Sequence, residues 1–217
     1  MTFKAMTILL IDEVEDGSVS GKSIASETLN FTTMFQMERK YISQAIQMSR
    51  VFQDAINDTT LKFEFNKALD LVRKKPEMAI IGTVNQSIIK QSCQVSAMVD
   101  EVIKLLNTVV GIALDEGSDT YNKFKDTITQ GFTNLAAQEN NAWIFWSSVT
   151  EKKTTYTYNV LYAVANKKTG SVMAAAPIGL TVTVDVEKEK VLFFTVKDKS
   201  NYEVNVQSII VVEALQA

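Results

Sequence analysis

The sequence predicts an α+β fold, a single-domain, three-layer αβα sandwich in which helical hairpins flank an antiparallel sheet. Residues 154–213 alternate apolar with small or polar side chains at a period of two, as successive side chains of a strand do. The connections between these runs are too short for a parallel crossover. Two segments with helical periodicity, 38–74 and 85–140, are available to cover the two faces of the sheet.

The order of elements follows from periodicity and from the breaks between periodic runs. A helix at 66–74 ends before Pro76, because the residue ahead of a proline disfavours the helical conformation. The break at 115–118 is short, so the helices on either side of it form an antiparallel pair. The predicted elements are a strand at 5–14, helices at 38–57 and 66–74, a strand at 78–83, helices at 85–114 and 119–140, and strands beginning at 142–146 and spanning 154–166, 171–186, 190–198 and 201–213.

Strand 171–186 shows the alternation most clearly. One face carries even-numbered apolar residues, whereas Thr181, Thr183 and Asp185 lie on the other. The first interpretation is a strand with one face on a core and the other beneath a second layer, so that both faces are covered. The second is a toxin-like strand that turns its apolar face to lipid, since a membrane strand needs about 9–11 residues with a water-facing alternate face. Both interpretations hold if the molecule has two states.

Residues 16–23 contain an incomplete match to a phosphate-binding loop. A predicted strand, Gly21-Lys22-Ser23 and a following helix give the right context, but three residues separate Gly17 from Gly21 where the motif needs four. Asp16 stands where the first glycine belongs, and its carboxylate would repel phosphate. We therefore expect a polar turn. The neighbouring acidic residues form a solvated edge and not a metal site; they are Asp12, Glu13, Glu15 and Asp16.

The composition excludes several functions. The chain has no histidine, which removes Ser-His-Asp, Cys-His and HExxH chemistry. Cys93 is the sole cysteine, and its place on a predicted helix favours a packed, inert thiol. A net charge of −3 without a basic cluster argues against nucleic acid as a partner. We expect no enzyme activity, no cofactor and no metal.

The sequence has the pattern of neither a signal peptide nor a membrane-spanning helix. The apolar run at 5–11 is followed at once by Asp12 and Glu13, so it reads as a strand and not as a signal peptide. Elsewhere no uninterrupted apolar run reaches the roughly 18–20 residues of a membrane-spanning helix. We expect a protein made in soluble form, without a signal peptide.

Several blocks of unusual composition resemble the Cyt δ-endotoxins, the cytolytic insecticidal crystal proteins. The resemblance runs in order from about Tyr41 to Leu215. Its blocks are 41–46 (YISQAI), 52–55 (FQDA), 85–87 (NQS), 132–135 (FTNL), 142–146 (AWIFW), 158–161 (YNVL) and 186–195 (VEKEKVLFFT).

The resemblance implies a membrane-perturbing toxin that is made in soluble or crystalline form and released outside the producing cell. Its partners would be membrane phospholipids and further copies of itself on the membrane, with no protein receptor and no catalytic residues. Helical layers would swing away and the long strands would engage the bilayer. Relatives are typically trimmed by proteases at both ends, whereas this chain begins and ends close to its predicted strands. We expect lysis without trimming.

The membrane-inserting residues follow from the strand faces. We expect them to be Val160, Tyr162, Val164, Ile178, Leu180, Val182, Val184, Phe194, Val204 and Val206. The alternative is a non-lytic, soluble lipid-binding module in which the same strands line a static core. Dye release from vesicles separates the two functions.

Overall fold

The structure, a computed structural model, describes residues 7–13, 19–21, 23–26, 31–34, 39–110, 119–140, 144–166 and 171–216. Its helices are α1 (Arg39–Gln53), α2 (Phe65–Arg73), α3 (Val95–Val110), α4 (Asp119–Gln130) and α5 (Lys188–Val191), with a 3-10 turn at Ala136–Gln138. Its strands are β1 (Thr7–Glu13), β2 (Val19–Gly21), β3 (Ser23–Ser26), β4 (Phe31–Met34), β5 (Ala79–Gln94), β6 (Ile144–Val149), β7 (Thr154–Asn166), β8 (Val172–Val184) and β9 (Lys199–Ala214).

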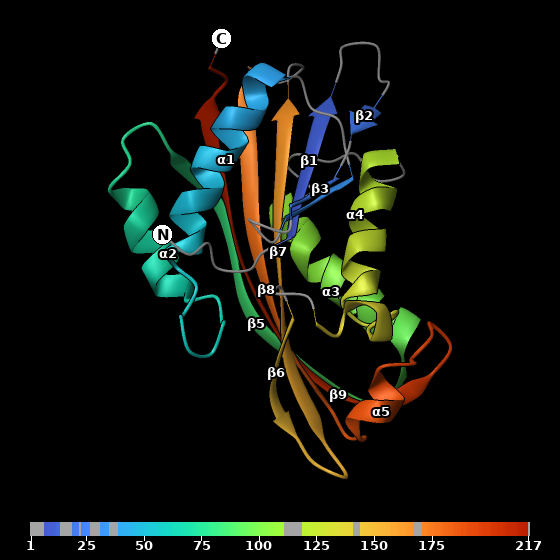
Figure 1. Cartoon of the computed structure of the whole chain (residues 1–217). Helices are drawn as coiled ribbons and strands as arrows, with labels where there is room; N and C mark the ends of the chain where they lie inside the picture. Colours follow the sequence, from blue (N-terminus) through green and yellow to red (C-terminus); the bar gives the residue numbers. More distant parts are fainter. Residues whose placement is uncertain are drawn as a thin grey trace.

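One large sheet organises these elements in the order β2-β1-β7-β8-β9-β5, and β6 pairs with the first residues of β7 (Figure 1). The four long strands β7, β8, β9 and β5 pair antiparallel, as predicted. β1 is an exception, because it runs parallel to β7 from Thr7 opposite Val160. A long stretch of chain lies between β1 and β7, so nothing forces the antiparallel hairpin that a short link imposes.

Helices cover both faces of this sheet, which confirms the three-layer αβα sandwich (Figure 1). Even-numbered residues of β7 and β8 face α3 and α4 and form the larger core with them. Odd-numbered residues lie on the opposite face of the sheet. Those near the end of β7 and the beginning of β8, such as Leu161 and Ala175, pack beneath α1 and α2. The apolar stripe of α1 explains this contact, since Ala45, Met48 and Phe52 recur at three and four residues and are fully buried.

The predicted helix 85–114 is wrong in its first ten residues. Residues 85–94 extend the predicted strand 78–83 into β5, and only Val95–Val110 is helical. β5 pairs with β9 along its length, from Ala79 opposite Val212 to Gln94 opposite Lys199. The main-chain hydrogen bonds of this long strand pair stabilise the extended conformation of residues 85–94. The spacing of Ile88 and Val95 suggested a helix, but it is equally compatible with a strand that continues into one. Cys93 therefore lies on a strand, half-buried, and its thiol donates to the Gln94 carbonyl.

The predicted strand 190–198 is also wrong. This segment is the short helix α5 followed by a turn, although its apolar residues 191–194 suggested a strand. The Asp198 carboxylate accepts hydrogen bonds from the Thr195 N–H and hydroxyl at 2.6 and 2.7 Å, which closes the turn. These bonds lower the pKa of Asp198, the backbone N–H more than the hydroxyl. Phe194 consequently sits in a connection and not on a strand face.

Other predicted features are shorter or lie outside the described residues. The helix predicted at 119–140 ends at Gln130, and a 3-10 turn follows after Gly131. Val19–Gly21 is a strand, which does not fit a phosphate loop, whereas Asp16, Gly17 and Lys22 lie outside the description. The same holds for Glu15, Trp143, the break at 115–118 and the β7–β8 connection at 167–170.

Candidate membrane-active sheet

Nine of the ten predicted membrane-inserting residues lie on one apolar sheet face, and Phe194 alone does not. Adjacent strands place them side by side, with Leu180 between Tyr158 and Val206, and Val182 between Tyr156 and Val204. All nine are at most 1% exposed. They are Val160, Tyr162, Val164, Ile178, Leu180, Val182, Val184, Val204 and Val206. In this state the face is therefore closed to lipid.

The α3–α4 layer and the turn after it close this face. Phe124 of α4 meets Tyr162 edge to face, with ring centroids 5.2 Å apart. Phe132 meets Tyr202 in the same way at 6.2 Å. The Tyr156 hydroxyl donates to the Gly131 carbonyl at 2.8 Å, which satisfies a polar group inside the apolar layer. One of these contacts comes from α4 and two come from the turn after it, and the cover can leave only if all three break.

The opposite sheet face changes character halfway along the strands. Near β1 it is apolar and lies beneath α1 and α2. At mid-sheet the Asn159 amide donates to the Leu61 carbonyl at 2.7 Å. Here the backbone of β8 touches the α1–α2 connection closely, since a Cβ added to Gly179 would lie 2.7 Å from Phe63 Cβ. Beyond this point the face leaves the helical cover and is polar except at Ile89 of β5.

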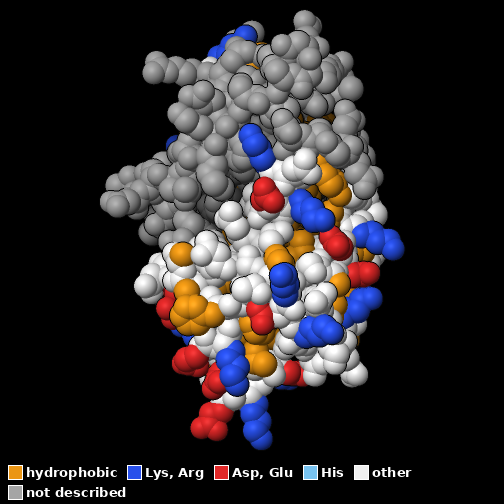
Figure 2. Space-filling view, turned by 90° about the vertical axis from the view of Figure 1, so that its right-hand side faces the viewer, with side chains coloured by type: hydrophobic (Ala, Val, Ile, Leu, Met, Phe, Trp, Pro, Cys, Tyr) orange, Lys and Arg blue, Asp and Glu red, His pale blue; other side chains and the backbone are white. Residues whose placement is uncertain are grey.

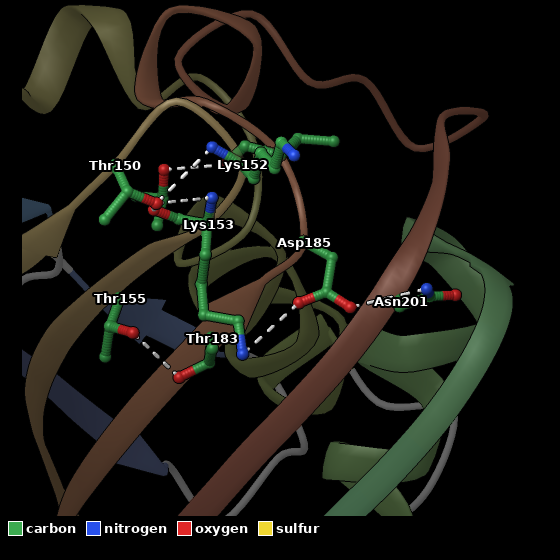
Figure 3. Close-up of polar contacts among 9 residues, drawn as sticks. Thr150, Lys152, Lys153, Thr155, Thr183, Asp185 and Asn201 are labelled. Atoms are coloured by element: carbon green, nitrogen blue, oxygen red, sulfur yellow. Dashed lines mark hydrogen bonds and ion pairs between the residues drawn. The ribbon is translucent and has the colours of Figure 1, made fainter.

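We call this polar region the lower half of the sheet, because it points down in Figure 1. It comprises residues 154–160 of β7, 178–184 of β8, 202–208 of β9 and 83–90 of β5. Figure 3 shows its last rows, where Thr155 and Thr183 share a hydrogen bond of 3.0 Å and Lys153 lies 3.7 Å from Asp185. Towards β5, Asn205 donates to Ser87 at 3.1 Å and Gln207 to Asn85 at 3.3 Å.

This polar ladder was only partly predicted. The sequence placed Thr181, Thr183 and Asp185 on one face but expected that face to be covered. Asp185 is in fact exposed and both threonines are half-buried. The contribution of Asn85 and Ser87 was missed because their segment was predicted as a helix. Residues 85–87 are all polar and Ile88 and Ile89 are both apolar, so no alternation marked this segment as a strand.

The lower half thus has the pattern of a membrane strand on four neighbouring strands. The lower half covers seven residues in each of β7, β8 and β9. A spanning strand needs about 9–11 residues, which the whole strands supply, since β7 and β8 have 13 residues each and β5 and β9 have 16. One face is apolar, and the side chains of the alternate face are half-buried or exposed except at Thr157 and Asn159, which are buried. Among the described residues, no helix is long and apolar enough to cross a membrane, and no cluster of His, Cys, Asp or Glu suits a metal ion.

Three tyrosines on the apolar face respond to alkaline pH. Burial raises the pKa of Tyr156, Tyr158 and Tyr202 above the ordinary tyrosine value, because the charged phenolate would lose its water. The neutral rings are stable in the fold at any pH below the ordinary value. Above it, the unfolded chain gives up protons that the folded chain retains, so unfolding becomes more favourable.

We therefore expect the free energy of unfolding to fall once the pH exceeds about 10. Each of the three tyrosines should steepen this loss by about 1.4 kcal/mol per pH unit. Tyr202→Phe should flatten the slope without lowering stability at pH 8, since the Tyr202 hydroxyl is buried and no described residue bonds to it. Denaturant titrations from pH 8 to 11.5 measure both slopes. Equal slopes for the two proteins would contradict the assignment.

Comparisons with known proteins assign the chain to a family. The model for the family described as "Bacillus thuringiensis toxin" matches residues 20–217. The chain is 42% identical to a type-2Aa cytolytic delta-endotoxin of Bacillus thuringiensis subsp. kyushuensis, over 89% of this chain and 74% of that protein. It is 38% identical to the type-2Ba cytolytic delta-endotoxin of subsp. israelensis, over 89% and 73%.

Solved structures agree with this assignment. A delta-endotoxin superposes with a TM-score of 0.78 at 42% identity, covering 83% of this chain and 79% of that one. An activated Cyt2Ba monomer from subsp. israelensis gives 0.79 at 38% identity, covering 83% and 96%. The chain therefore belongs to the Bacillus thuringiensis toxin family, among the cytolytic delta-endotoxins.

Proposed function

We propose that this chain permeabilises phospholipid bilayers by uncovering the apolar face of its lower half and turning that face to lipid. The observation that carries the proposal is the asymmetry of four neighbouring strands, which are apolar on one face and polar on the other along the same rows. Much of their polar face already meets water, and Thr157 and Asn159 are the buried exceptions. The α3–α4 layer and the turn after it must leave, and the α5 connection must release Val191, Leu192 and Phe194 from the same core.

The strand number supports assembly of several copies on the membrane. The described part of one chain offers four long strands, β5, β7, β8 and β9, whereas membrane barrels have at least about eight. A closed barrel therefore needs at least two chains, and closure is required because unpaired strand edges are not tolerated in the hydrocarbon region. We propose a homo-oligomer in which residues 1–217 of each copy act as one cytolysin domain at the membrane of a target cell.

Lipid alone should be a sufficient partner. The proposed step exposes apolar surface and buries it in hydrocarbon, a transfer that calls for neither a protein receptor nor catalysis. The chain has no histidine to serve as a general base, which is consistent with a non-enzymatic action.

Dye release tests this function directly. The purified chain should release a trapped fluorophore from pure phosphatidylcholine vesicles, with no receptor present. Tight vesicle binding without release would identify the alternative, a non-lytic lipid-binding module. A lack of both binding and release would overturn lipid as the partner.

A further inference from the structure

We propose that residues 187–198, the α5 connection between β8 and β9, make the first contact with the bilayer and insert Phe193 and Val196 into its interface. This inference rests on the proposed function and adds a docking site that acts before the helical cover opens. Its partner is the interfacial region of a phospholipid bilayer.

Phe193 differs from its neighbours in exposure. Its side chain is 74% exposed, whereas Leu192 and Phe194 are half-buried. Val191 is buried, and Leu192 and Phe194 pack against the core beneath α3 and α4. Val196 is 43% exposed on the same connection. The apolar run thus divides into residues that hold the connection on the core and residues that point to solvent.

The connection is ordered by hydrogen bonds on both sides of Phe193. The Phe193 N–H donates to the Lys190 carbonyl at 3.1 Å, and the turn beyond is closed by Asp198. The first turn of α3 holds the same segment, since the Ser96 N–H donates to the Val196 carbonyl at 3.0 Å. Phe193 is therefore presented in a fixed backbone, so little conformational entropy is lost when it enters the interface.

A second contact ties the connection to β6 and to the turn after α4. The Lys188 ammonium forms an ion pair with the Glu139 carboxylate and lies 4.6 Å from the centre of the Trp146 ring. The Ala136 N–H donates to the Leu192 carbonyl at 3.0 Å. Docking through Phe193 would therefore bring the end of the helical cover to the lipid surface.

The position and charge of the connection suit a membrane interface. α5 and the β6–β7 hairpin lie at the same end of the sheet, where the lower half ends (Figure 1). Residues 150–153 and 185–199 together contain six lysines and five carboxylates, in a chain of net charge −3. Figure 2, viewed from the side that carries α4 and α5 in Figure 1, shows hydrophobic side chains at the surface among these charge types. Aromatic rings flanked by lysines are typical of interfacial anchors.

The size of the patch favours lipid over a protein partner. A specific protein interface buries about 1,200–2,000 Å² around a packed apolar core. Here the connection exposes two large apolar side chains, Phe193 and Val196, with Lys190 and Lys197 close by in sequence and also exposed. A fluid interface accommodates separate side chains of this kind, whereas a rigid partner needs a continuous surface.

Flotation with phosphatidylcholine vesicles tests the docking site. Phe193→Ala should weaken vesicle binding about tenfold, the lower end of what burial of a phenylalanine contributes, with an unchanged melting temperature. Phe193→Trp should bind as the wild type does. Ile81→Ala is the matched control, because Ile81 is 39% exposed on β5 near the opposite end of the sheet. It should bind normally.

Unchanged binding by Phe193→Ala would overturn the inference, as would an equal loss in Ile81→Ala. If Phe193→Ala keeps vesicle binding and loses only its action on cells, the site docks a protein, and the lipid assignment is wrong. The proposed function is judged separately by wild-type dye release. Release by the wild type with normal binding by Phe193→Ala would remove the docking site and leave the function intact. If the wild type binds vesicles without releasing dye and Phe193→Ala binds them more weakly, the docking site stands and the proposed function is wrong.

Discussion

A disulfide between residues 131 and 158 should suppress dye release about 100-fold and leave vesicle binding intact. A Cβ added to Gly131 lies 3.4 Å from Tyr158 Cγ, close to where a cysteine sulfur at 158 would stand, so the bond is within reach. It would hold the turn after α4 over the middle of the apolar face. A cross-link across a loop of this size disfavours open states by about 3 kcal/mol, which corresponds to the expected factor.

The experiment uses Gly131→Cys and Tyr158→Cys in a Cys93→Ser background, so that no other thiol competes. The reduced double variant is the matched control, because it carries the same loss of the Tyr158 ring without the bond. Reductant should restore dye release to that reduced level. Full release by the oxidised protein would favour a mechanism that perturbs the bilayer without uncovering the sheet.

Phe124→Ala should speed dye release while lowering stability. Phe124 is fully buried on α4, where its ring packs on Tyr162. Truncation of a buried phenylalanine costs about 3–5 kcal/mol, and this cost falls on the contact between the helical cover and the apolar face. If opening of that cover limits lysis, the rate of dye release should rise at least about tenfold, since only part of the loss needs to appear in the opening step.

Phe52→Ala is the matched control for this prediction. Phe52 is equally buried, but it lies on α1 in the core of the opposite layer. Its truncation should lower the free energy of unfolding by a similar amount without a matching rise in dye release, because α1 does not cover the lipid-facing side. Denaturant titration measures the free energy of unfolding of both variants, and leakage kinetics measure their rates of dye release. Equal acceleration would show that general loosening drives lysis, and the specific role of α3–α4 would be lost.

The apolar face could be predicted from the sequence because strand parity is a local property. Leu180, Val182 and Val184 alternate with Thr181, Thr183 and Asp185, and this alternation alone assigns their faces. The sandwich followed from the same logic, since apolar residues on both faces of a strand require two covers.

The errors arose where long-range pairing decides the outcome. Residues 85–94 carry spacing compatible with a helix, and only β9 makes them a strand. Residues 191–194 have the pattern of a strand, but no strand within the described part of the chain pairs with them, and their apolar side chains anchor a turn instead. The polar ladder depended on the register of Asn85 and Ser87 against β9, which no local pattern contains. Exposure of Phe193 likewise depends on how α5 packs.

The alternation of strand β8 in the presence of lipid is the most direct test of the account. Single cysteines at positions 180 to 185, each in the Cys93→Ser background, are labelled in denaturant with an environment-sensitive dye and refolded before vesicles are added. The even positions should become accessible to lipid-borne quenchers and the odd positions to aqueous quenchers, with a period of two. Quenching that shows no period along these six positions would contradict strand insertion and leave surface disruption as the mechanism.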